Sequence, residues 1–277
     1  MLLSYKINNF EQKINASEQN IFNLGPRKIL SNKSTDPTFN QPWYNEGFKV
    51  FKAFDSNEFS LIKHNIKRTI IHQLERENID TTNFDLEKYH DFVQTDIDHF
   101  KIVSRTRDLF NEDFYNPIIN LKRTFSNQLG FKLTDKDPTN GKRIHIIIRI
   151  IRPFQNDYNP PHKDIYELVD KNKSLLKMIN FWIPICGLTN ETSLPVVPSS
   201  HLLNENKILR TRKGGIINGK KYNVRLIKSW NSDNNLIRPS MEYEDTLIFS
   251  SHLIHGIATN NQKNRTRISL EFRLVKK

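Results

Sequence analysis

The stretch NPPHKDIYE, residues 159–167, contains a histidine and an aspartate separated by one residue, His162 and Asp164. Side chains two apart on an extended chain project to the same side, so one backbone segment can deliver two metal ligands. A third candidate, His255, lies 93 residues downstream (255 − 162 = 93) in SHLIHGIATN. Two histidines and one carboxylate on one face of a metal are the ligand set of mononuclear iron(II) oxygenases, which leave the opposite positions open for cosubstrate and dioxygen.

Alone, the His-x-Asp pattern is weak, because a chain with nine histidines can contain it by chance in a polar loop. The order of the residues that follow strengthens the metal interpretation. Asp245 begins an expected strand that ends near His255, and Arg267 and Ser269 share one face of the last expected strand. A guanidinium pairs with a carboxylate through two hydrogen bonds, and a hydroxyl can add a third. Such a pair is suited to the distal carboxylate of a dicarboxylic 2-oxoacid whose other end chelates iron.

Alternatives remain for several of these residues. An arginine-rich edge strand is the other interpretation of three arginines in this region, Arg265, Arg267 and Arg273. His145 and His252 compete as metal ligands. His145 lies on an apolar strand and His252 three residues before His255, so we expect both to be ordinary histidines outside the metal site.

The elements that position these residues change type along the chain. FKVFKAF (48–54) alternates like a strand, and residues 1–45 look like an extended lead-in that packs on the domain. Asp55 and Glu58 form a capping box for an amphipathic helix that reaches about Arg76. Further helices are expected over 95–114 and 117–129, the second ending at Gly130.

The second half consists of short β-branched or aromatic runs bounded by turn residues, at 143–153, 177–185, 194–197, 220–228, 245–251 and 267–275. GGIINGKK (214–221) is typical of a hairpin connection. The pattern predicts an α+β fold with a double-stranded β-helix (jelly-roll, cupin-like) core and N-terminal helices packed on one sheet. We expect one domain over 1–277, with a mainly helical part (1–135) and a jelly-roll core (140–277).

The composition favours a globular protein. The chain has 36% hydrophobic residues, which is enough to build a core, and a single cysteine, Cys186, which excludes an internal disulfide and fits a reducing compartment. No signal peptide or membrane-spanning run is expected, and we predict a cytoplasmic protein. The net charge is +12, but the Lys and Arg residues are scattered rather than gathered into one face. Nucleic-acid binding is therefore not predicted, whereas an anionic small substrate stays open.

Three stretches resemble the phytanoyl-CoA dioxygenase-like iron(II)/2-oxoglutarate oxygenases over about residues 143–275. They are RIIRPFQNDYNPPHKD, NFWIPICGLTNETSLPVVPSSH and DTLIFSSHLIHGIATNNQKNRTRISLEFRL. The resemblance implies that His162, Asp164 and His255 bind Fe(II). It implies 2-oxoglutarate as cosubstrate, O2 as oxidant, and Arg267 as the cosubstrate-binding arginine, with Arg265 as the second choice because the spacing varies.

The resemblance also bears on neighbouring residues. Trp182 corresponds to a strand aromatic that lines the cosubstrate pocket, with Asn180 on the same side, although an ordinary core aromatic is an equal alternative. PSSH (198–201) differs from the family's Pro-Gly-Ser-His turn because Ser199 replaces glycine, which puts the turn geometry in doubt. We expect His201 to be structural or substrate-lining. Asp164 argues against halogenation, since related halogenases have a small residue at this position to free a site for chloride.

The family oxidises small molecules, and the expected reaction is hydroxylation or a related oxidation of one of them, with a sugar or natural-product intermediate as an option. Basic residues near the expected mouth of the site suit an anionic substrate or a solvated surface, with the solvated surface slightly favoured: Lys163, Lys171, Lys173, Arg210, Arg212 and Lys213. The sequence leaves two other functions open, a metal-free jelly-roll binding protein and a protein or nucleic-acid hydroxylase. It does not predict the oligomeric state.

Overall fold

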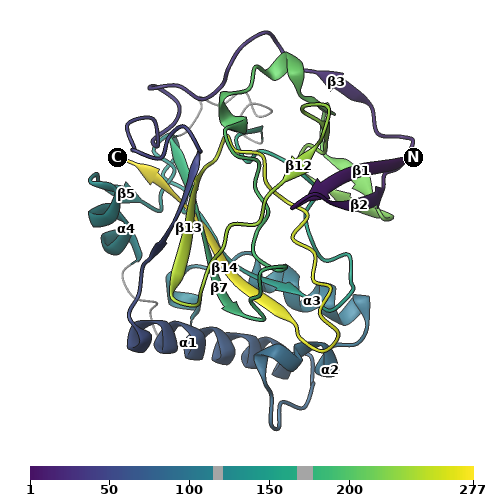
Figure 1. The fold of residues 1–277 in the computed structure, drawn as a ribbon. Helices are drawn as coiled ribbons and strands as arrows, with labels where there is room; N and C mark the ends of the chain where they lie inside the picture. Colours follow the sequence, from purple (N-terminus) through teal and green to yellow (C-terminus); the bar gives the residue numbers. More distant parts are fainter. Residues whose placement is uncertain (115–120, 167–176) are drawn as a thin grey trace.

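The computed structural model describes residues 1–114, 121–166 and 177–277 of the chain (Figure 1). Its strands are β1 (Leu2–Ile7), β2 (Phe10–Asn15), β3 (Phe22–Leu24), β4 (Phe48–Lys52), β5 (Leu133–Thr134), β6 (Ile146–Ile151), β7 (Met178–Cys186), β8 (Leu209–Thr211), β9 (Gly215–Ile217), β10 (Lys220–Tyr222), β11 (Ile227–Ser229), β12 (Asn235–Leu236), β13 (Asp245–Ser250) and β14 (Arg267–Lys276). Its helices are α1 (Ser56–Glu75), α2 (Tyr89–Phe92), α3 (Asp96–Thr106) and α4 (Leu121–Leu129).

The largest sheet has six antiparallel strands in the order β4-β13-β7-β14-β5, with β6 also paired to β14. Ten residues long, β14 pairs with β7 along one edge and with β6 and β5 along the other. It is therefore a central strand. The alternative of an arginine-rich edge strand is wrong for Arg267 and Arg273, because both lie on a strand that is paired on both sides.

Side chains of the large sheet alternate between its two faces, as the period of two in a strand requires. One face of β14 carries four apolar residues that belong to the main hydrophobic cluster: Ile268, Leu270, Phe272 and Leu274. The opposite face carries Arg267, Ser269, Glu271 and Arg273. On β7 the same alternation places Phe181 in the main cluster and Asn180 and Trp182 on the other side. The sheet thus has an apolar face and a face rich in polar groups.

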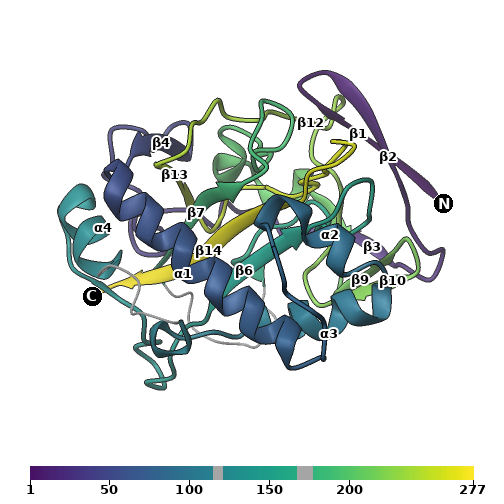
Figure 2. The ribbon, with the colours of Figure 1, turned by 90° about the horizontal axis from the view of Figure 1, so that it is seen from below.

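The helices cover the apolar face. Figure 2 shows α1 crossing the large sheet, with α3 beside β6 and α4 near the C-terminal end of β14. Ile62 and Ile66 of α1 are fully buried, and the ring of Phe125 on α4 lies 4.5 Å from the ring of Phe181. The capping box of Asp55 and Glu58 is present at the start of α1, as predicted. Helices therefore pack on one sheet and leave the polar face free for a site.

Two expected helices differ from the prediction. The helix expected over 95–114 ends at Thr106, because Leu109 exchanges backbone hydrogen bonds with Ile146 (3.1 and 2.7 Å); only a short 3-10 turn, Asn111–Asp113, follows. The helix expected over 117–129 is described from Leu121, and its first residues lie outside the described part of the chain. It ends before Gly130, whose φ of 74° is typical of a C-terminal glycine.

Smaller sheets form a second layer, with orders β12-β1-β2 and β11-β8-β3 (Figure 1). The lead-in expected over 1–45 contains β1, β2 and β3, and the helices begin only at Ser56. The hairpin predicted at 214–221 is formed by β9 and β10, with positive φ at Asn218 and Gly219, as a type I′ turn requires. The expected strand at 194–197 is absent. In its place Val196 makes isolated bridges to Ile237 and His255.

Besides the two larger hydrophobic clusters there is a third, smaller one that includes Trp182, Leu247 and Phe249. Within the ranges that the structure describes, none of the helices is long and apolar enough to cross a membrane.

Candidate metal centre

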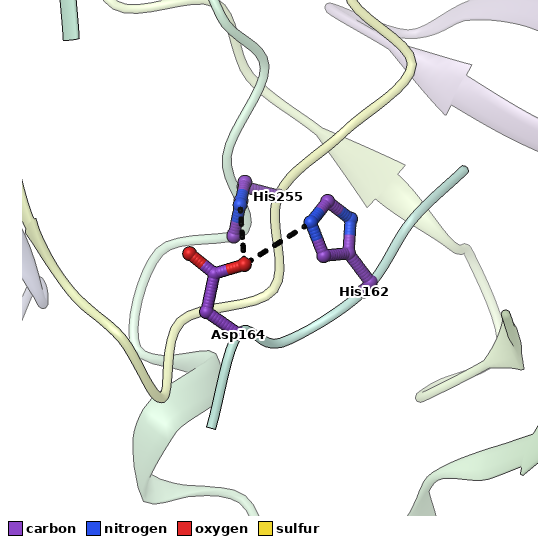
Figure 3. A group of neighbouring side chains, drawn as sticks. All are labelled: His162, Asp164 and His255. Carbon is purple, nitrogen blue, oxygen red and sulfur yellow. Dashed lines mark ion pairs between the residues drawn. The ribbon is translucent and has the colours of Figure 1, made fainter. Parts of the chain in front are cut away.

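His162 and His255 lie directly opposite each other on two extended segments. The amide of His162 donates to the carbonyl of His255 (2.9 Å), and the amide of His255 donates to that of His162 (3.1 Å). Two residues that exchange both hydrogen bonds in this way are a hydrogen-bonded antiparallel pair. Figure 3 shows the two imidazole rings beside the Asp164 carboxylate. The backbone pairing thus brings together side chains that are 93 residues apart (255 − 162 = 93).

Gly256 allows the two segments to come this close. Its φ is 140°, and a Cβ atom at this position would lie 2.4 Å from the carbonyl oxygen of Pro160. That same oxygen lies 2.7 Å from Nδ1 of His162. A side chain at residue 256 would therefore push away the group that orients one of the two histidines.

Both histidines present Nε2 to Asp164. The Nδ1 atoms lie 2.7 and 3.0 Å from the carbonyl oxygens of Pro160 and Leu253, and a carbonyl only accepts hydrogen bonds, so each Nδ1 carries the hydrogen. In the neutral ring Nε2 is then a lone-pair donor. The Nε2 atoms lie 3.4 Å (His162) and 3.9 Å (His255) from Oδ1 of Asp164, as the dashed lines in Figure 3 mark.

Asp164 Oδ1 is buried and accepts no hydrogen bond from any residue that the structure describes. Three lone-pair donors, two nitrogens and one oxygen, therefore converge, and the coordinating atoms of the three residues all lie within 4.8 Å of one another. Such an arrangement is repulsive unless a cation lies between the three atoms. Ligand atoms about 2.1 Å from one ion and at right angles to each other are about 3 Å apart, which is within about 1 Å of the 3.4 and 3.9 Å between the two Nε2 atoms and Oδ1. The residues fit a divalent metal.

The electrostatics keep His255 and Asp164 in their metal-binding forms. Burial and the neighbouring His162 lower the pKa of His255 to about 4, so its ring is neutral at pH 7. Burial acts to raise the pKa of Asp164, but Arg273 and the two imidazoles outweigh it and hold that pKa well below its ordinary value. A neutral imidazole and a charged carboxylate are the forms that coordinate a metal.

The second carboxylate oxygen of Asp164 is held by the large sheet. Asn180 Nδ2 on β7 donates to Oδ2 at 2.9 Å, and Arg273 Nε on β14 donates to the same atom at 2.7 Å. Asn180 and Arg273 are register partners across the two strands. The sequence assigned Asn180 to the cosubstrate; the structure brings it to Asp164.

A pocket opens beside the three ligands. Its walls combine the polar face of the sheet with apolar side chains, and its lining residues include Arg149, Tyr158, Asn159, Asn180, Trp182, Leu194, Phe249, Ala258, Glu271 and Arg273. Trp182, which the sequence assigned either to a cosubstrate pocket or to the core, both lines this pocket and belongs to the third hydrophobic cluster.

Arg267 is not among the residues that line this pocket and is buried, with 1% of its surface exposed. Its Nη1 donates to Ser269 Oγ and its Nη2 to the carbonyl of Ala258, both at 3.3 Å, and its guanidinium lies 5.7 Å from the Trp182 ring. Among the described residues, Arg267 Nε and Trp182 Nε1 are buried donors that have no acceptor. Burial lowers the pKa of Arg267 to about 10, so the group is charged at pH 7. Buried, unpaired donors of this kind suit a carboxylate ligand.

Sequence reasoning missed two polar residues of the pocket, Glu271 and Arg149. Glu271 accepts from Arg149 Nε (2.9 Å) and from Ser269 Oγ (3.2 Å), so a hydrogen-bonded chain connects Arg267, Ser269 and Glu271 along β14. The alternation of RISLEFR contains the signal, because residues 267, 269, 271 and 273 share one face of a strand.

Other candidate residues lie outside the site. Arg265, the second choice for the cosubstrate, precedes β14; its side chain is more than half exposed, and its Nε lies 3.3 Å from Glu87. His145 is partly exposed and paired with Asp108. His252 is buried against the carbonyl of Thr35, and His201 is buried beside the ring of Tyr44. Neither His145 nor His252 lies among the three grouped ligands, as expected.

Lys163, between the two ligands of the His-x-Asp segment, points away from the pocket. It is 1% exposed and bonds Glu205, which also accepts from Tyr166 (2.8 Å) and pairs with Arg210. Lys163 and Arg210 are therefore neither on a solvated surface, the slightly favoured alternative, nor lining the pocket, because both pair with the one buried carboxylate of Glu205. Lys171 and Lys173 lie outside the described residues. The buried pair instead anchors the segment that carries two ligands.

The turn at 198–201 explains how serine replaces glycine. Ser199 has φ 59° and ψ 4°, the left-handed conformation that glycine adopts without strain, and its hydroxyl donates to the carbonyl of Asn45 at 2.8 Å. The turn geometry is thus kept at the cost of strain in a residue with a side chain.

We expect Ser199→Gly to raise the free energy of unfolding by about 0.5 kcal/mol, because relief of the left-handed strain of about 1 kcal/mol exceeds the lost surface hydrogen bond. Urea unfolding measures the change. Ser200→Gly is the matched control. Ser200 Oγ accepts from the buried amide of Ile254 (2.8 Å), so its loss should destabilise the protein by about 1–2 kcal/mol. Destabilisation by both substitutions would contradict the interpretation of Ser199.

Comparisons with known proteins give a fold. Neither the family models nor the curated proteins contain a match to this sequence. Among solved structures, EctD from S. alaskensis, crystallised with 2-oxoglutarate and 5-hydroxyectoine, is similar over 95% of this chain and 86% of that chain, with 11% identity and a TM-score of 0.50. AviO1 from Streptomyces viridochromogenes Tue57 (12% identity, 90% and 96% covered, TM-score 0.44) and the epimerase SnoN with Fe3+ and alpha ketoglutarate (11% identity, 84% and 80% covered, TM-score 0.43) are more distant. The chain therefore has a mixed fold of helices and antiparallel sheets that is similar to the fold of EctD.

Proposed function

We propose that this protein is a non-haem Fe(II)- and 2-oxoglutarate-dependent oxygenase that hydroxylates, or otherwise oxidises, a small molecule. The observation that carries the proposal is the convergence of the two Nε2 atoms of His162 and His255 on a buried oxygen of Asp164 that accepts no hydrogen bond from the described residues. In this proposal the core is a double-stranded β-helix, and the similarity to EctD supports it at the level of the fold.

His162, Asp164 and His255 would hold the iron, because two imidazoles and one carboxylate on one side of the ion leave its other positions open. Bound there, Fe(II) together with 2-oxoglutarate supplies dioxygen activation, with succinate and CO2 as products. EctD has been crystallised with 2-oxoglutarate and with Fe, which supports the same pair of cofactors here.

Arg267 and Ser269 would bind the distal carboxylate of 2-oxoglutarate. The guanidinium is buried and charged, its Nε has no acceptor within the described chain, and Ser269 Oγ already lies 3.3 Å from Nη1. The indole of Trp182 lies beside this guanidinium and would form a wall of the cosubstrate pocket. Burial strengthens a charge-assisted pair between a guanidinium and a carboxylate, because water does not compete for the same donors.

The substrate would occupy the part of the pocket lined by Tyr158, Asn159, Leu194 and Phe249. Asp164 would itself be the third protein ligand, so no coordination position is freed for chloride. This favours oxygen insertion or a related oxidation over halogenation. The mixture of apolar and polar walls suits a small molecule with polar groups, such as a sugar or a natural-product intermediate.

The test uses the wild-type protein. Fe(II) and 2-oxoglutarate added together without oxygen should give a weak visible charge-transfer band that neither gives alone, and admission of air should produce succinate. Absence of both the band and succinate would contradict the proposal and favour a metal-free binding protein with the same fold.

A further inference from the structure

The Asp164 carboxylate makes two different sets of contacts through its two oxygens. Oδ1 faces the Nε2 atoms of both histidines, whereas Oδ2 accepts from Asn180 Nδ2 (2.9 Å) and Arg273 Nε (2.7 Å). The two donors come from neighbouring strands of the rigid central sheet, where Asn180 and Arg273 are register partners. Asp164 itself is 3% exposed and lies at the end of a loop segment.

We propose that Asn180 and Arg273 are positioning residues that hold Asp164 as a metal ligand through one oxygen only. This inference rests on the proposed function, because it requires a metal at the three ligands. Neither residue is a metal ligand; both act by donating a hydrogen bond to Oδ2 of Asp164.

A carboxylate can bind a metal through one oxygen or through both, and a free Asp side chain turns readily about its terminal bond. Two hydrogen bonds to Oδ2 fix that bond and occupy the oxygen that would otherwise swing toward the metal. Chelation through both oxygens would consume a position that cosubstrate or dioxygen must use. Partners of this kind, which hold a ligand without touching the metal, typically change metal affinity by about 10- to 100-fold.

The charge of Arg273 makes the inference testable by the sign of the effect. A guanidinium bonded to a ligand oxygen repels a nearby divalent cation, so removal of the charge alone would tighten metal binding. Loss of the hydrogen bonds that fix Asp164 would weaken metal binding. Asn180 is neutral, and its removal has only the second effect. If fixing the carboxylate is the role of both residues, both truncations must weaken binding.

The experiment titrates the metal-free protein with Co(II) as an air-stable probe and follows the visible absorption of the bound ion. The variants are Asn180→Ala, Arg273→Met, the double variant and Arg273→Lys. We expect each single truncation to weaken Co(II) binding by about 10-fold or more. The double variant should lose less than the product of the two single effects, since both donors serve one oxygen. Arg273→Lys, which keeps a charged donor, should recover part of the affinity.

Lys52→Gln is the matched control for charge. It removes one positive charge from β4, where the side chain is 69% exposed and pairs with Glu244, and it should leave Co(II) affinity unchanged. Thermal unfolding of the metal-free variants distinguishes a loss of folding stability from a loss of metal binding. A positioning residue should lower Co(II) affinity while the melting temperature of the metal-free protein changes little.

Tighter or unchanged Co(II) binding in Arg273→Met or Asn180→Ala would overturn the inference, and so would two fully multiplicative effects in the double variant. If Arg273→Met does not fold, Asn180→Ala decides by the same criterion. Wild-type protein that binds neither Co(II) nor Fe(II) would instead overturn the proposed function.

Discussion

Replacement of His162 by alanine is expected to weaken Fe(II) binding by more than about 100-fold and to abolish both the charge-transfer band and succinate formation. Residues that only support a metal ligand change affinity by about 10- to 100-fold, so loss of a ligand must exceed that range. Equilibrium dialysis against Fe(II) without oxygen measures the affinity, and a succinate assay in air measures the reaction.

The control for this experiment is His145→Ala. His145 is a histidine of the same chain that is partly exposed and paired with Asp108, so its removal should leave Fe(II) binding unchanged. His162 Nδ1 bonds the carbonyl of Pro160, and this contact is lost in His162→Ala as well. Circular dichroism must therefore show that the variant keeps its fold. A folded His162→Ala protein that still forms succinate at the wild-type rate would contradict the assignment of His162 as a metal ligand.

Replacement of Arg267 by methionine is expected to have the second large effect, on the KM for 2-oxoglutarate. The loss of a buried, charged hydrogen-bonding group is worth about 3 kcal/mol, so the KM for 2-oxoglutarate should rise by about 100-fold. Fe(II) affinity should change little, because the hydrogen bonds of Arg267 within the described residues go to Ser269 and Ala258 and not to His162, Asp164 or His255. The measurement compares the KM from initial rates of succinate formation with Fe(II) binding from dialysis.

Arg265→Met tests the alternative arginine directly. Arg265 lies two residues away in the sequence, but its side chain is exposed and pairs with Glu87. We expect its KM for 2-oxoglutarate to equal that of the wild type. A large rise in KM for Arg265→Met with none for Arg267→Met would reverse the assignment of the two residues.

The strands that build the site could be predicted from the sequence because they are buried on both sides. β7, β13 and β14 are β-branched or aromatic runs bounded by turns, and period-two alternation placed Arg267 with Ser269 and Asn180 with Trp182. The hairpin of β1 and β2 was not predicted, although β1 alternates buried and exposed residues and the turn at Asn8 and Asn9 is local. Most of β2 is exposed and polar, which hides the strand pattern, and the pairing of β1 with β12 joins segments more than 200 residues apart.

The contacts within the site were harder to predict than its residues. The sequence suggested that Asp164 is a ligand, but not that Asn180 and Arg273 hold its second oxygen, because that contact depends on the register of β7 against β14. Lys163 looked like an exposed base near a loop, whereas Glu205, 42 residues later, buries its charge. In both cases the partner is set by tertiary packing.

The mutual backbone hydrogen bonds of His162 and His255 have a consequence for the metal of the proposed function, which concerns how that metal would leave and return. These bonds join main-chain atoms, so they persist when the ion leaves, and the two imidazoles keep their places opposite each other. A site built in this way is preorganised, and the ion need not order the chain when it binds. If the protein is the Fe(II) enzyme proposed above, removal of the ion by a chelator would stop its reaction without unfolding the domain. Fresh Fe(II) would then restore activity with no refolding step.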